Sequence, residues 1–261
     1  ENGGLPPKQV TQDIDTILHW MDEMVKGELE PLLLKLAEEL AFALNCPTNK
    51  LIFKREALAT VGIWVAKKRY ALMVSNNEGV QYPKPKLKFT GLEAKKSDYP
   101  EFCREWLKQA YQLALNENEA SVHNMVKKAK AEFMAKPVHL IAAPKSVNNI
   151  EKYIENGHAI KGTPAQVKAA NNYNTMLTKV GSMEKPIVSG DKILIAPLRP
   201  GAPMGMESIW FPEYLPEEFD LERWVDYKES FRKYFIEPLN NFVKAVGWSP
   251  EPRASVMQFF S

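Results

Sequence analysis

The sequence has little cysteine, and what it has forms no recognisable site. Only Cys46 and Cys103 occur in 261 residues, too far apart to make a Cys-x-x-Cys pair. A disulfide framework or a zinc site is therefore not expected, and a reducing cytosol is the simpler interpretation. The four histidines form no His-x-x-x-His or His-Glu-x-x-His pattern either, so the commonest helical zinc motifs are excluded.

Long hydrophobic runs are absent as well. The longest apolar stretch begins at Pro31 and is interrupted by Lys35, Glu38 and Glu39, so no membrane-spanning segment is expected. The sequence also contains no Gly-x-Gly-x-x-Gly, P-loop or Gly-x-Ser-x-Gly motif. It therefore offers no local support for dinucleotide binding, P-loop nucleotide hydrolysis or a serine hydrolase.

An Asp-x-Asp pair near the start leaves two interpretations open. Asp13 and Asp15 can bring two carboxylates onto Mg²⁺. They also stand directly before a helical stripe of apolar residues, with no strand ahead of them. Acidic residues stabilise the N-terminus of a helix, which is the simpler interpretation.

Positive charge is scarce overall but concentrated in one segment. The net charge is only +2, yet residues 67–96 contain eight Lys and Arg against Glu78 and Glu93. This segment therefore carries +6 and the rest of the chain −4. Such a concentration is expected where a protein meets a polyanion, and a solvated basic face is the alternative.

The first 95 or so residues have an α+β pattern. Apolar residues recur at helical spacing from Asp13 to Leu44, and Pro31 is expected to kink or divide that helix. Runs rich in β-branched and aromatic residues predict strands over 50–56, 62–74 and 85–93. The stretch 75–79 has the composition of a turn.

Helices dominate the remainder. Ser97 or Asp98 is expected to cap a helix over 101–116. Further helices are predicted over 119–136, 146–157, 163–181 and 217–246, with one strand over 191–198 and a Pro/Gly loop over 197–205.

The stretch "IWVAKKRYALMV" at 63–74 places adjacent cations within an apolar run. In a strand, alternate side chains share a face, so Lys68 and Tyr70 are expected on one side and Lys67 and Arg69 on the other. Such a strand can lie against a nucleic-acid duplex and contact phosphates or minor-groove acceptors, which are nearly independent of sequence. Glu56 precedes this run and is either a structural ion-pair partner or an acid beside a metal site.

Residues 55–97 resemble the C-terminal palm of family B DNA polymerases of the T-even-type bacteriophage kind. That family shows the patterns R-E-A-I, G-F-W, K-K-R-Y-A-L-N-V, E-G, P-K-L-K-x-x-G-L-E and K-S in this order. Weaker likenesses to the thumb of those enzymes occur at 146–153, 173–181 and 197–205, and 254–261 resembles their sliding-clamp-binding tail. The thumb pattern P-F-H-I-R-G is replaced by "PAQVKA" at 164–169, so contacts there are not carried over.

The resemblance implies an α+β fold in three parts. A partial palm with a small antiparallel sheet and a long helix would span 1–96, a mostly helical thumb 97–248, and a clamp-binding tail 249–261. It implies that Glu56 is an auxiliary acid near the metal site. Duplex DNA would be contacted by Lys67, Lys68, Arg69, Tyr70, Lys86, Lys88, Lys96 and Arg199. The clamp would be bound by Val256, Met257, Phe259 and Phe260.

The family's catalytic motifs, D-x-x-S-L-Y-P-S and Y-x-D-T-D, are missing from the sequence. Phosphoryl transfer by two metals needs those aspartates. The expectation is therefore a C-terminal subunit or fragment of a DNA-directed DNA polymerase, inactive alone, completed by an N-terminal polymerase fragment that supplies the Mg²⁺ site. Its other partners would be primer–template DNA and a sliding clamp, in the cytoplasm of an infected bacterium and without a membrane. The alternatives are a non-enzymatic duplex-binding processivity module and a helical interaction protein.

Overall fold

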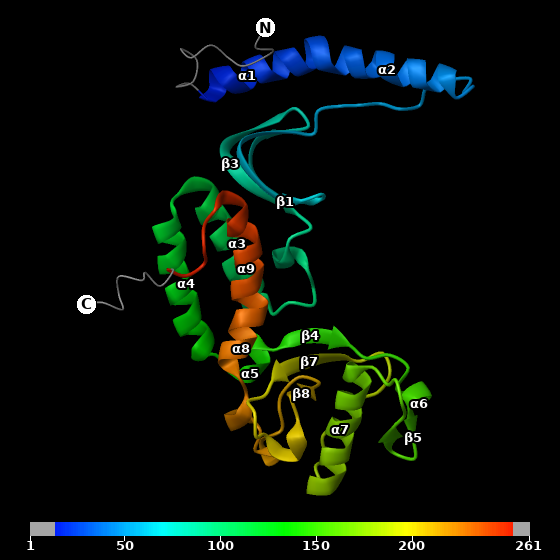
Figure 1. The fold of residues 1–261 in the computed structure, drawn as a ribbon, viewed down its shortest axis with the longest axis vertical. Helices are drawn as coiled ribbons and strands as arrows, with labels where there is room; N and C mark the ends of the chain where they lie inside the picture. The colour runs from blue at the N-terminus through cyan, green and yellow to red at the C-terminus, as the bar shows by residue number, and fades with distance from the viewer. Residues whose placement is uncertain (1–13, 253–261) are drawn as a thin grey trace. The chain divides into compact units, whose positions relative to one another are not determined.

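The computed structural model describes residues 14–252 and divides them into two compact units (Figure 1). Unit 1 comprises the chain up to Gly62 together with Ala71–Phe89, and unit 2 comprises Ile63–Tyr70 together with the chain from Thr90 onward. Within the described residues, no helix is long and apolar enough to cross a membrane. The predicted clamp-binding residues Val256, Met257, Phe259 and Phe260 lie outside the described residues.

Unit 1 begins with a long helix in three parts. These are α1 (Ile14–Met24), the π-helical turn η2 (Val25–Leu29) and α2 (Glu30–Ala43). Pro31 lies in the first turn of α2. Because Pro31 has no N–H to donate to the preceding turn, the helix widens into a π turn directly before it. The predicted division of this helix at Pro31 is confirmed.

The segment 50–56, predicted as a strand, is irregular in the structure. Arg55 in this segment bonds to side chains of the long helix. The Arg55 guanidinium donates to Asp22 at 2.7 Å, and the Arg55 backbone N–H donates to Glu30 at 3.0 Å. The strand prediction was therefore wrong, because β-forming composition was outweighed by these contacts with the helix.

A three-stranded sheet follows, in the order β1-β2-β3, with β1 at Ala57–Ala66, β2 at Arg69–Asn77 and β3 at Val80–Thr90. The sequence predicted one strand over 62–74, but the chain turns at Lys67 and Lys68. Lys68 has a φ of 61°, in the left-handed region. The predicted sharing of one face by Lys68 and Tyr70 was therefore wrong, since alternation of faces holds only within one strand.

The second connection of this sheet is also a two-residue turn. Glu78 and Gly79 have φ values of 50° and 87°, the combination typical of tight hairpins. Asn76 stabilises the turn by accepting from the Gly79 backbone N–H at 3.1 Å. The turn predicted over 75–79 is confirmed, although β2 extends three residues into that range.

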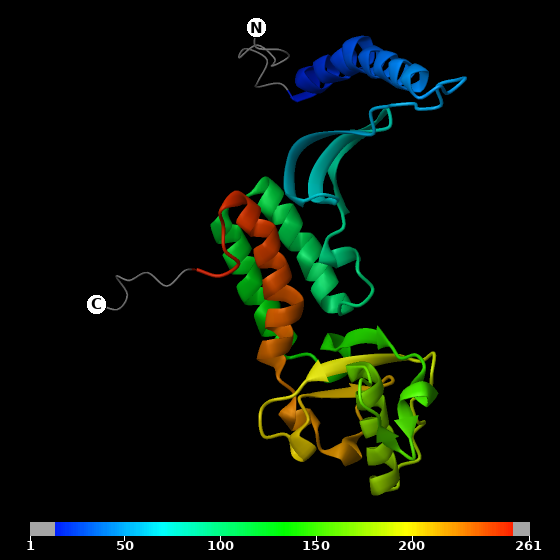
Figure 2. The same ribbon diagram turned by 45° about the vertical axis from the view of Figure 1, so that its right-hand side comes forward.

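Unit 2 contains a helical bundle made from two distant parts of the chain. The helices α3 (Glu101–Asn116) and α4 (Glu119–Met134) pack with a C-terminal helix, as both ribbon views show (Figure 1, Figure 2). Completely buried side chains fill the bundle, with the rings of Tyr111 and Phe242 only 4.4 Å apart between centroids. The C-terminal helix comprises α8 (Tyr227–Phe231), the π turn η7 (Arg232–Ile236), α9 (Glu237–Val243) and the 3₁₀ turn η8 (Lys244–Val246).

The limits of these helices show where sequence reasoning succeeded. The helix over 101–116 is confirmed, but Pro100 precedes it and no side chain caps it. Asp98 instead accepts from Lys145 at 2.9 Å, so the predicted cap was wrong. The final helix begins at Tyr227 and not at Glu217, because Asp226 caps it and the chain before it forms 3₁₀ turns. Those turns are η5 (Glu217–Phe219) and η6 (Glu222–Trp224).

A second antiparallel sheet lies in the same unit, in the order β4-β7-β8, with β4 at Ala143–Ser146, β7 at Lys192–Pro197 and β8 at Ser208–Phe211. The register pairs Ala143 with Ile195 and Leu194 with Phe211. The helix α7 (Ala165–Val180) packs against β8 and ends at Gly181, whose φ is 66°. The strand over 191–198 and the helix over 163–181 are therefore confirmed, but β4 and β8 were not predicted.

The helix predicted over 146–157 is mostly absent. Only one turn forms there, α6 (Ile150–Tyr153), and it is followed by a small hairpin of β5 (Ile154–Glu155) and β6 (His158–Ala159). Asn156 and Gly157 both have positive φ, which turns the chain back. Three short elements complete the fold: η3 (Glu93–Lys95), α5 (Val138–Ile141) and η4 (Pro203–Gly205). The α+β class predicted from the sequence is confirmed.

Candidate nucleic-acid interface

The turn between β1 and β2 presents two exposed cations. Among the described residues, neither Lys67 nor Lys68 has a hydrogen-bond or ion-pair partner. The strands on either side contribute two rings, Trp64 and Tyr70, whose centroids are 6.4 Å apart. Unpaired ammonium groups beside aromatic side chains are well suited to a polyanion, because no internal ion pair has to be given up.

Arg69, the third cation of this run, is engaged internally. Its Nη2 lies 2.6 Å from Glu93 Oε1, and its Nε donates to the Gly91 carbonyl at 3.2 Å. The Glu93 carboxylate is only 6% exposed and also accepts from Lys96 Nζ at 3.0 Å. Arg69 and Lys96, both predicted to contact DNA, are therefore paired with one buried carboxylate.

Gly91 fits closely against the turn. Its φ is 65°, and a Cβ at this position would lie 2.2 Å from the carbonyl oxygen of Lys68. No side chain can occupy that space without displacing the backbone of the turn. The Lys67–Lys68 turn is thus packed directly on Gly91, the residue that follows β3.

A second charged cluster lies in unit 1. Lys88 Nζ donates to Glu56 at 2.5 Å and to Asn77 at 3.0 Å. The hydrogen bond from Lys88 holds the pKa of the exposed Glu56 carboxyl below its ordinary value. The structure thus places Glu56 in an ion pair, one of the two roles open from sequence. Its role beside a metal stays a prediction, and no group of three or more potential metal ligands occurs in the described part of the chain.

The other predicted DNA-binding residues are exposed but separate. The Lys86 ammonium lies 4.3 Å from the centroid of the Tyr82 ring. Arg199 follows β7, and its guanidinium donates to the backbone carbonyl of Arg223. No contact in unit 2 joins Arg199 to the Lys67–Lys68 turn among the described hydrogen bonds and ion pairs. Their roles in binding DNA stay predictions.

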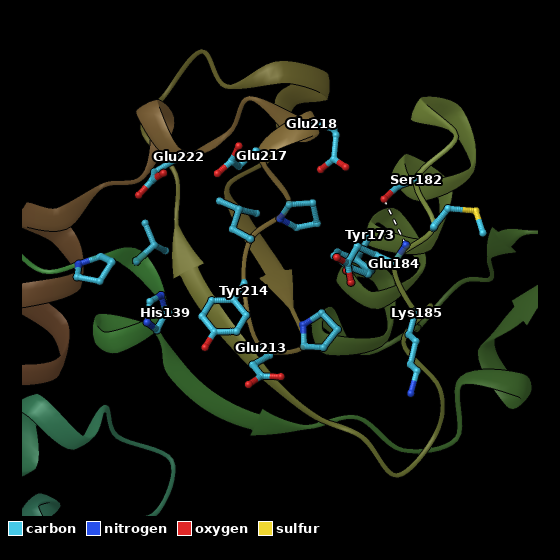
Figure 3. A pocket seen from close by; sticks show the side chains of 16 residues that line it. His139, Tyr173, Ser182, Glu184, Lys185, Glu213, Tyr214, Glu217, Glu218 and Glu222 are labelled. Atoms are coloured by element: carbon cyan, nitrogen blue, oxygen red, sulfur yellow. Dashed lines mark hydrogen bonds between the residues drawn. The ribbon is translucent and has the colours of Figure 1, made fainter.

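A hollow in unit 2 is acidic and was not predicted. It has a volume of about 1120 Å³ and lies beside α7 and the strand β8 (Figure 3). His139 and Tyr214 meet edge-to-face there, with ring centroids 4.8 Å apart. Its carboxylates are Glu184, Glu213, Glu217, Glu218 and Glu222. Five carboxylates and one lysine, Lys185, give this hollow a negative charge, which disfavours binding of a phosphate backbone. The hollow is therefore not expected to contact DNA as the basic turn does.

Comparison with known proteins gives the family context. No family model matches the chain. It is 30% identical over 252 residues to the DNA-directed DNA polymerase of Enterobacteria phage T4, covering 92% of this chain and 28% of that polymerase. It is 32% identical over 258 residues to the DNA-directed DNA polymerase of Escherichia phage RB69, covering 93% and 28%. The chain thus spans little more than a quarter of these relatives, and its resemblance to the C-terminal part of T-even-type family B DNA polymerases is confirmed.

Proposed function

We propose that this chain is the part of a DNA-directed DNA polymerase that grips primer–template duplex and completes the palm. The catalytic aspartates would come from an N-terminal polymerase fragment on a separate chain. The observation that carries the proposal is the Lys67–Lys68 turn, whose two exposed ammonium groups have no partner among the described residues. Such groups can neutralise backbone phosphates of DNA of any sequence, and a replicative enzyme must bind DNA of any sequence.

The residues beside the turn favour a duplex over a simple anion. Trp64 is exposed and Tyr70 half-buried, and the two rings lie next to each other on the same hairpin. Aromatic faces next to cations can pack against sugars and bases, while the ammonium groups reach the backbone. Lys86 and Arg199 are proposed as further contacts of the duplex, and Lys88 as a weaker one because it is already paired with Glu56.

The exposed apolar side chains of unit 1 support the proposal that another protein binds there. Ten of the eighteen exposed large apolar side chains in the described residues fall within 29–53. Leu32, Leu36 and Leu40 recur at helical spacing along α2, and each is about half exposed. Contiguous exposed apolar surface of this kind marks an interaction site, for which we propose the N-terminal polymerase fragment.

The chemistry of the assembled polymerase would depend on that partner. Mg²⁺ would be held by the partner's carboxylates and would stabilise charge on the transferred phosphoryl group. Glu56 would be an auxiliary acid near that site, with Lys88 keeping it ionised. The C-terminal residues Val256, Met257, Phe259 and Phe260 would bind the sliding clamp in the cytoplasm of the infected host.

Duplex binding is tested with a matched pair of double variants. Lys67→Ala/Lys68→Ala removes the cations of the turn, and Lys127→Ala/Lys128→Ala removes two adjacent exposed lysines of α4. Each phosphate contact contributes about 0.9 to the log–log slope of affinity against salt, so the first variant is expected to lower the slope by up to about 1.8. The second variant is expected to leave it unchanged, and equal effects of the two would contradict the proposed grip.

The same binding assay addresses sequence independence. Fluorescence anisotropy with several primer–template duplexes of different sequence should show the same proportional loss for Lys67→Ala/Lys68→Ala. A loss confined to one duplex sequence would mean that the turn recognises particular bases.

Catalysis is tested by primer extension with Mg²⁺ and the four deoxynucleotides. The chain alone is expected to extend no primer. Extension by the chain alone would refute the proposal that the catalytic aspartates come from a separate polypeptide. Addition of the part of the T4 polymerase that precedes the matched region is expected to restore extension. Duplex and clamp binding without any restored extension would favour the non-enzymatic processivity module.

A further inference from the structure

We propose that Arg69 is a positioning residue and not a DNA contact: with Gly91 and Glu93 it fixes the Lys67–Lys68 turn, and of these three adjacent cations only the two lysines reach the duplex. The inference rests on the proposed duplex grip and refines it. Three adjacent cations that look equivalent in sequence would then have two different roles.

Two of the three guanidinium nitrogens of Arg69 already have partners within the protein. Its Nη2 and Nε bond to Glu93 and to the Gly91 carbonyl, so one guanidinium holds two points of the chain that follow it by more than twenty residues. The fork geometry of arginine suits such two-point attachment, and a phosphate bound at Nε and Nη2 would have to compete with both partners.

Releasing Arg69 would also leave Glu93 poorly compensated. Its carboxylate is 6% exposed, and its second oxygen, Oε2, is buried without a hydrogen-bond partner. Among the described residues, Lys96 would remain as the one cation bonded to the carboxylate. Burial of an ion without its partner is unfavourable, so Arg69 is expected to stay on Glu93 when a duplex binds.

Gly91 provides the second point of attachment. It lies close enough to the turn that an added Cβ would be 2.2 Å from the Lys68 carbonyl oxygen and 3.0 Å from Arg69 Cγ. Lys68 itself has a φ of 61°, which non-glycine residues adopt only where the surroundings require it. The close packing of Gly91 and the fork of Arg69 are the surroundings that hold Lys68 in this conformation.

The first experiment changes the shape of the turn without changing any charge. Gly91→Ala introduces the colliding Cβ, and Gly79→Ala is its matched control. Gly79 also has a positive φ and lies in the other turn of the sheet, but a Cβ there has open space. Affinity for a primer–template duplex is expected to fall about tenfold for Gly91→Ala and less than about twofold for Gly79→Ala. Equal affinities of the two variants would overturn the role of Gly91.

The second experiment is a mutant cycle between Arg69→Ala and Lys67→Ala/Lys68→Ala. If Arg69 acts through the lysines, its removal weakens duplex binding in the wild-type protein but has no further effect once both lysines are absent. If Arg69 contacts a phosphate directly, its removal costs the same in both backgrounds and lowers the salt slope by a further 0.9 or so.

Glu93→Gln is expected to change duplex affinity in opposite directions, depending on whether net charge or the positioning of the turn controls binding. Removal of a negative charge next to the basic turn would tighten duplex binding if only the net charge mattered. If Arg69 positions the turn, the loss of the Glu93 charge loosens its attachment and weakens duplex binding, which is the expected result. Tighter binding by Glu93→Gln would overturn the proposal.

The outcomes also separate this inference from the proposed function. If Lys67→Ala/Lys68→Ala leaves duplex binding unchanged, the proposed grip itself is wrong. If that variant loses binding but Arg69→Ala is additive with it, the grip stands and the positioning role fails. Near-ultraviolet circular dichroism of each variant identifies any global unfolding, and Glu93→Gln remains decisive if Gly91→Ala does not fold.

Discussion

The helix α2 of unit 1 and the helix α3 of unit 2 differ in how far their leucine side chains are exposed. In unit 2, Leu107 of α3 is 0% exposed. In unit 1, Leu36 of α2 is 51% exposed, although it lies in an equally regular helix. Unit 2 thus covers its apolar side chains with its own elements, whereas unit 1 presents a surface that another polypeptide can cover.

This difference shows what each unit needs in order to be stable. The aromatic and aliphatic core of unit 2 supplies the burial that drives folding. The long helix of unit 1 buries few of its own side chains, with Ala37 the one buried residue of α2. Since an amphipathic helix gains most of its stability from packing, unit 1 is expected to gain more from a partner than unit 2.

The largest expected contrast is between the two cysteines. Cys46 of unit 1 is exposed, whereas Cys103 of unit 2 is completely buried, and burial raises its pKa to about 12. Because the thiolate is the reactive form, Cys103 is expected to react with iodoacetamide at pH 8 at least about a thousandfold more slowly. Mass spectrometry of the labelled peptides measures both rates. Equal rates would mean that the core of unit 2 opens readily.

The same leucine-to-alanine change is expected to have different effects in the two units. Leu107→Ala should lower the free energy of unfolding by about 2–5 kcal/mol, because it leaves a cavity in a closed core. Leu36→Ala should change it by less than about 0.5 kcal/mol. Urea denaturation followed by circular dichroism measures both. A large effect of Leu36→Ala would show that α2 is covered within this chain.

A smaller difference in stability between the two units is expected from helix capping. Asn118 accepts from the Ser121 backbone N–H at 3.1 Å and caps α4, whereas no side chain caps α2. Asn118→Ala is expected to lower the free energy of unfolding of unit 2 by about 1 kcal/mol. Asn124→Ala, an exposed position within the same helix, should be neutral or slightly stabilising. Similar losses for both would point to helix propensity and not to the cap.

The smallest effect is expected for an ion pair. The hydrogen bond from Lys145 holds the pKa of Asp98 below its ordinary value in the folded protein. Asp98 therefore contributes stability above the pKa it has in the unfolded chain, and this contribution is lost as the pH falls through its lower folded pKa. Asp98→Asn should cost under about 1 kcal/mol at pH 7, and this difference should vanish in acid unfolding experiments near pH 2.

An exposed ion pair in unit 1, Glu56–Lys88, is the control for the Asp98–Lys145 pair. Glu56→Gln removes the exposed partner of Lys88, whose hydrogen bond likewise lowers the pKa of Glu56. Because Glu56 is exposed, we expect no measurable change in unfolding. A clear loss of stability would show that the Glu56–Lys88 pair is buried by a contact that forms in solution.

Much of the fold was predictable because the relevant patterns are local. The helices α3, α4 and α7 follow apolar residues at helical spacing, and the strand β7 follows a short β-branched run. The strands β4 and β8 were missed because they are only four residues long and gain their stability from pairing with β7. Their sequences contain too few residues to show a period.

The candidate site was predictable in composition but not in geometry. Local sequence suggested one continuous strand through Lys67 and Lys68, because residues 63–74 contain no Gly, Asn, Asp or Pro to indicate a turn. The turn depends on Lys68 adopting a left-handed conformation beside Gly91, which is distant in sequence. The internal pairing of Arg69 with Glu93 was missed for the same reason.

The amino-acid sequence alone was enough to establish the α+β class, the place of the basic segment and the likeness to phage polymerases. These depend on periodicity, composition and residue order, which are properties of the chain itself. Only the tertiary structure decided that Lys67 and Lys68 have no ion-pair partner in the part of the chain that the structure describes, while Arg69 and Lys96 are bound to Glu93. The pairing of a charge depends on which groups folding brings within about 4 Å of it, and that distance is not encoded in neighbouring residues.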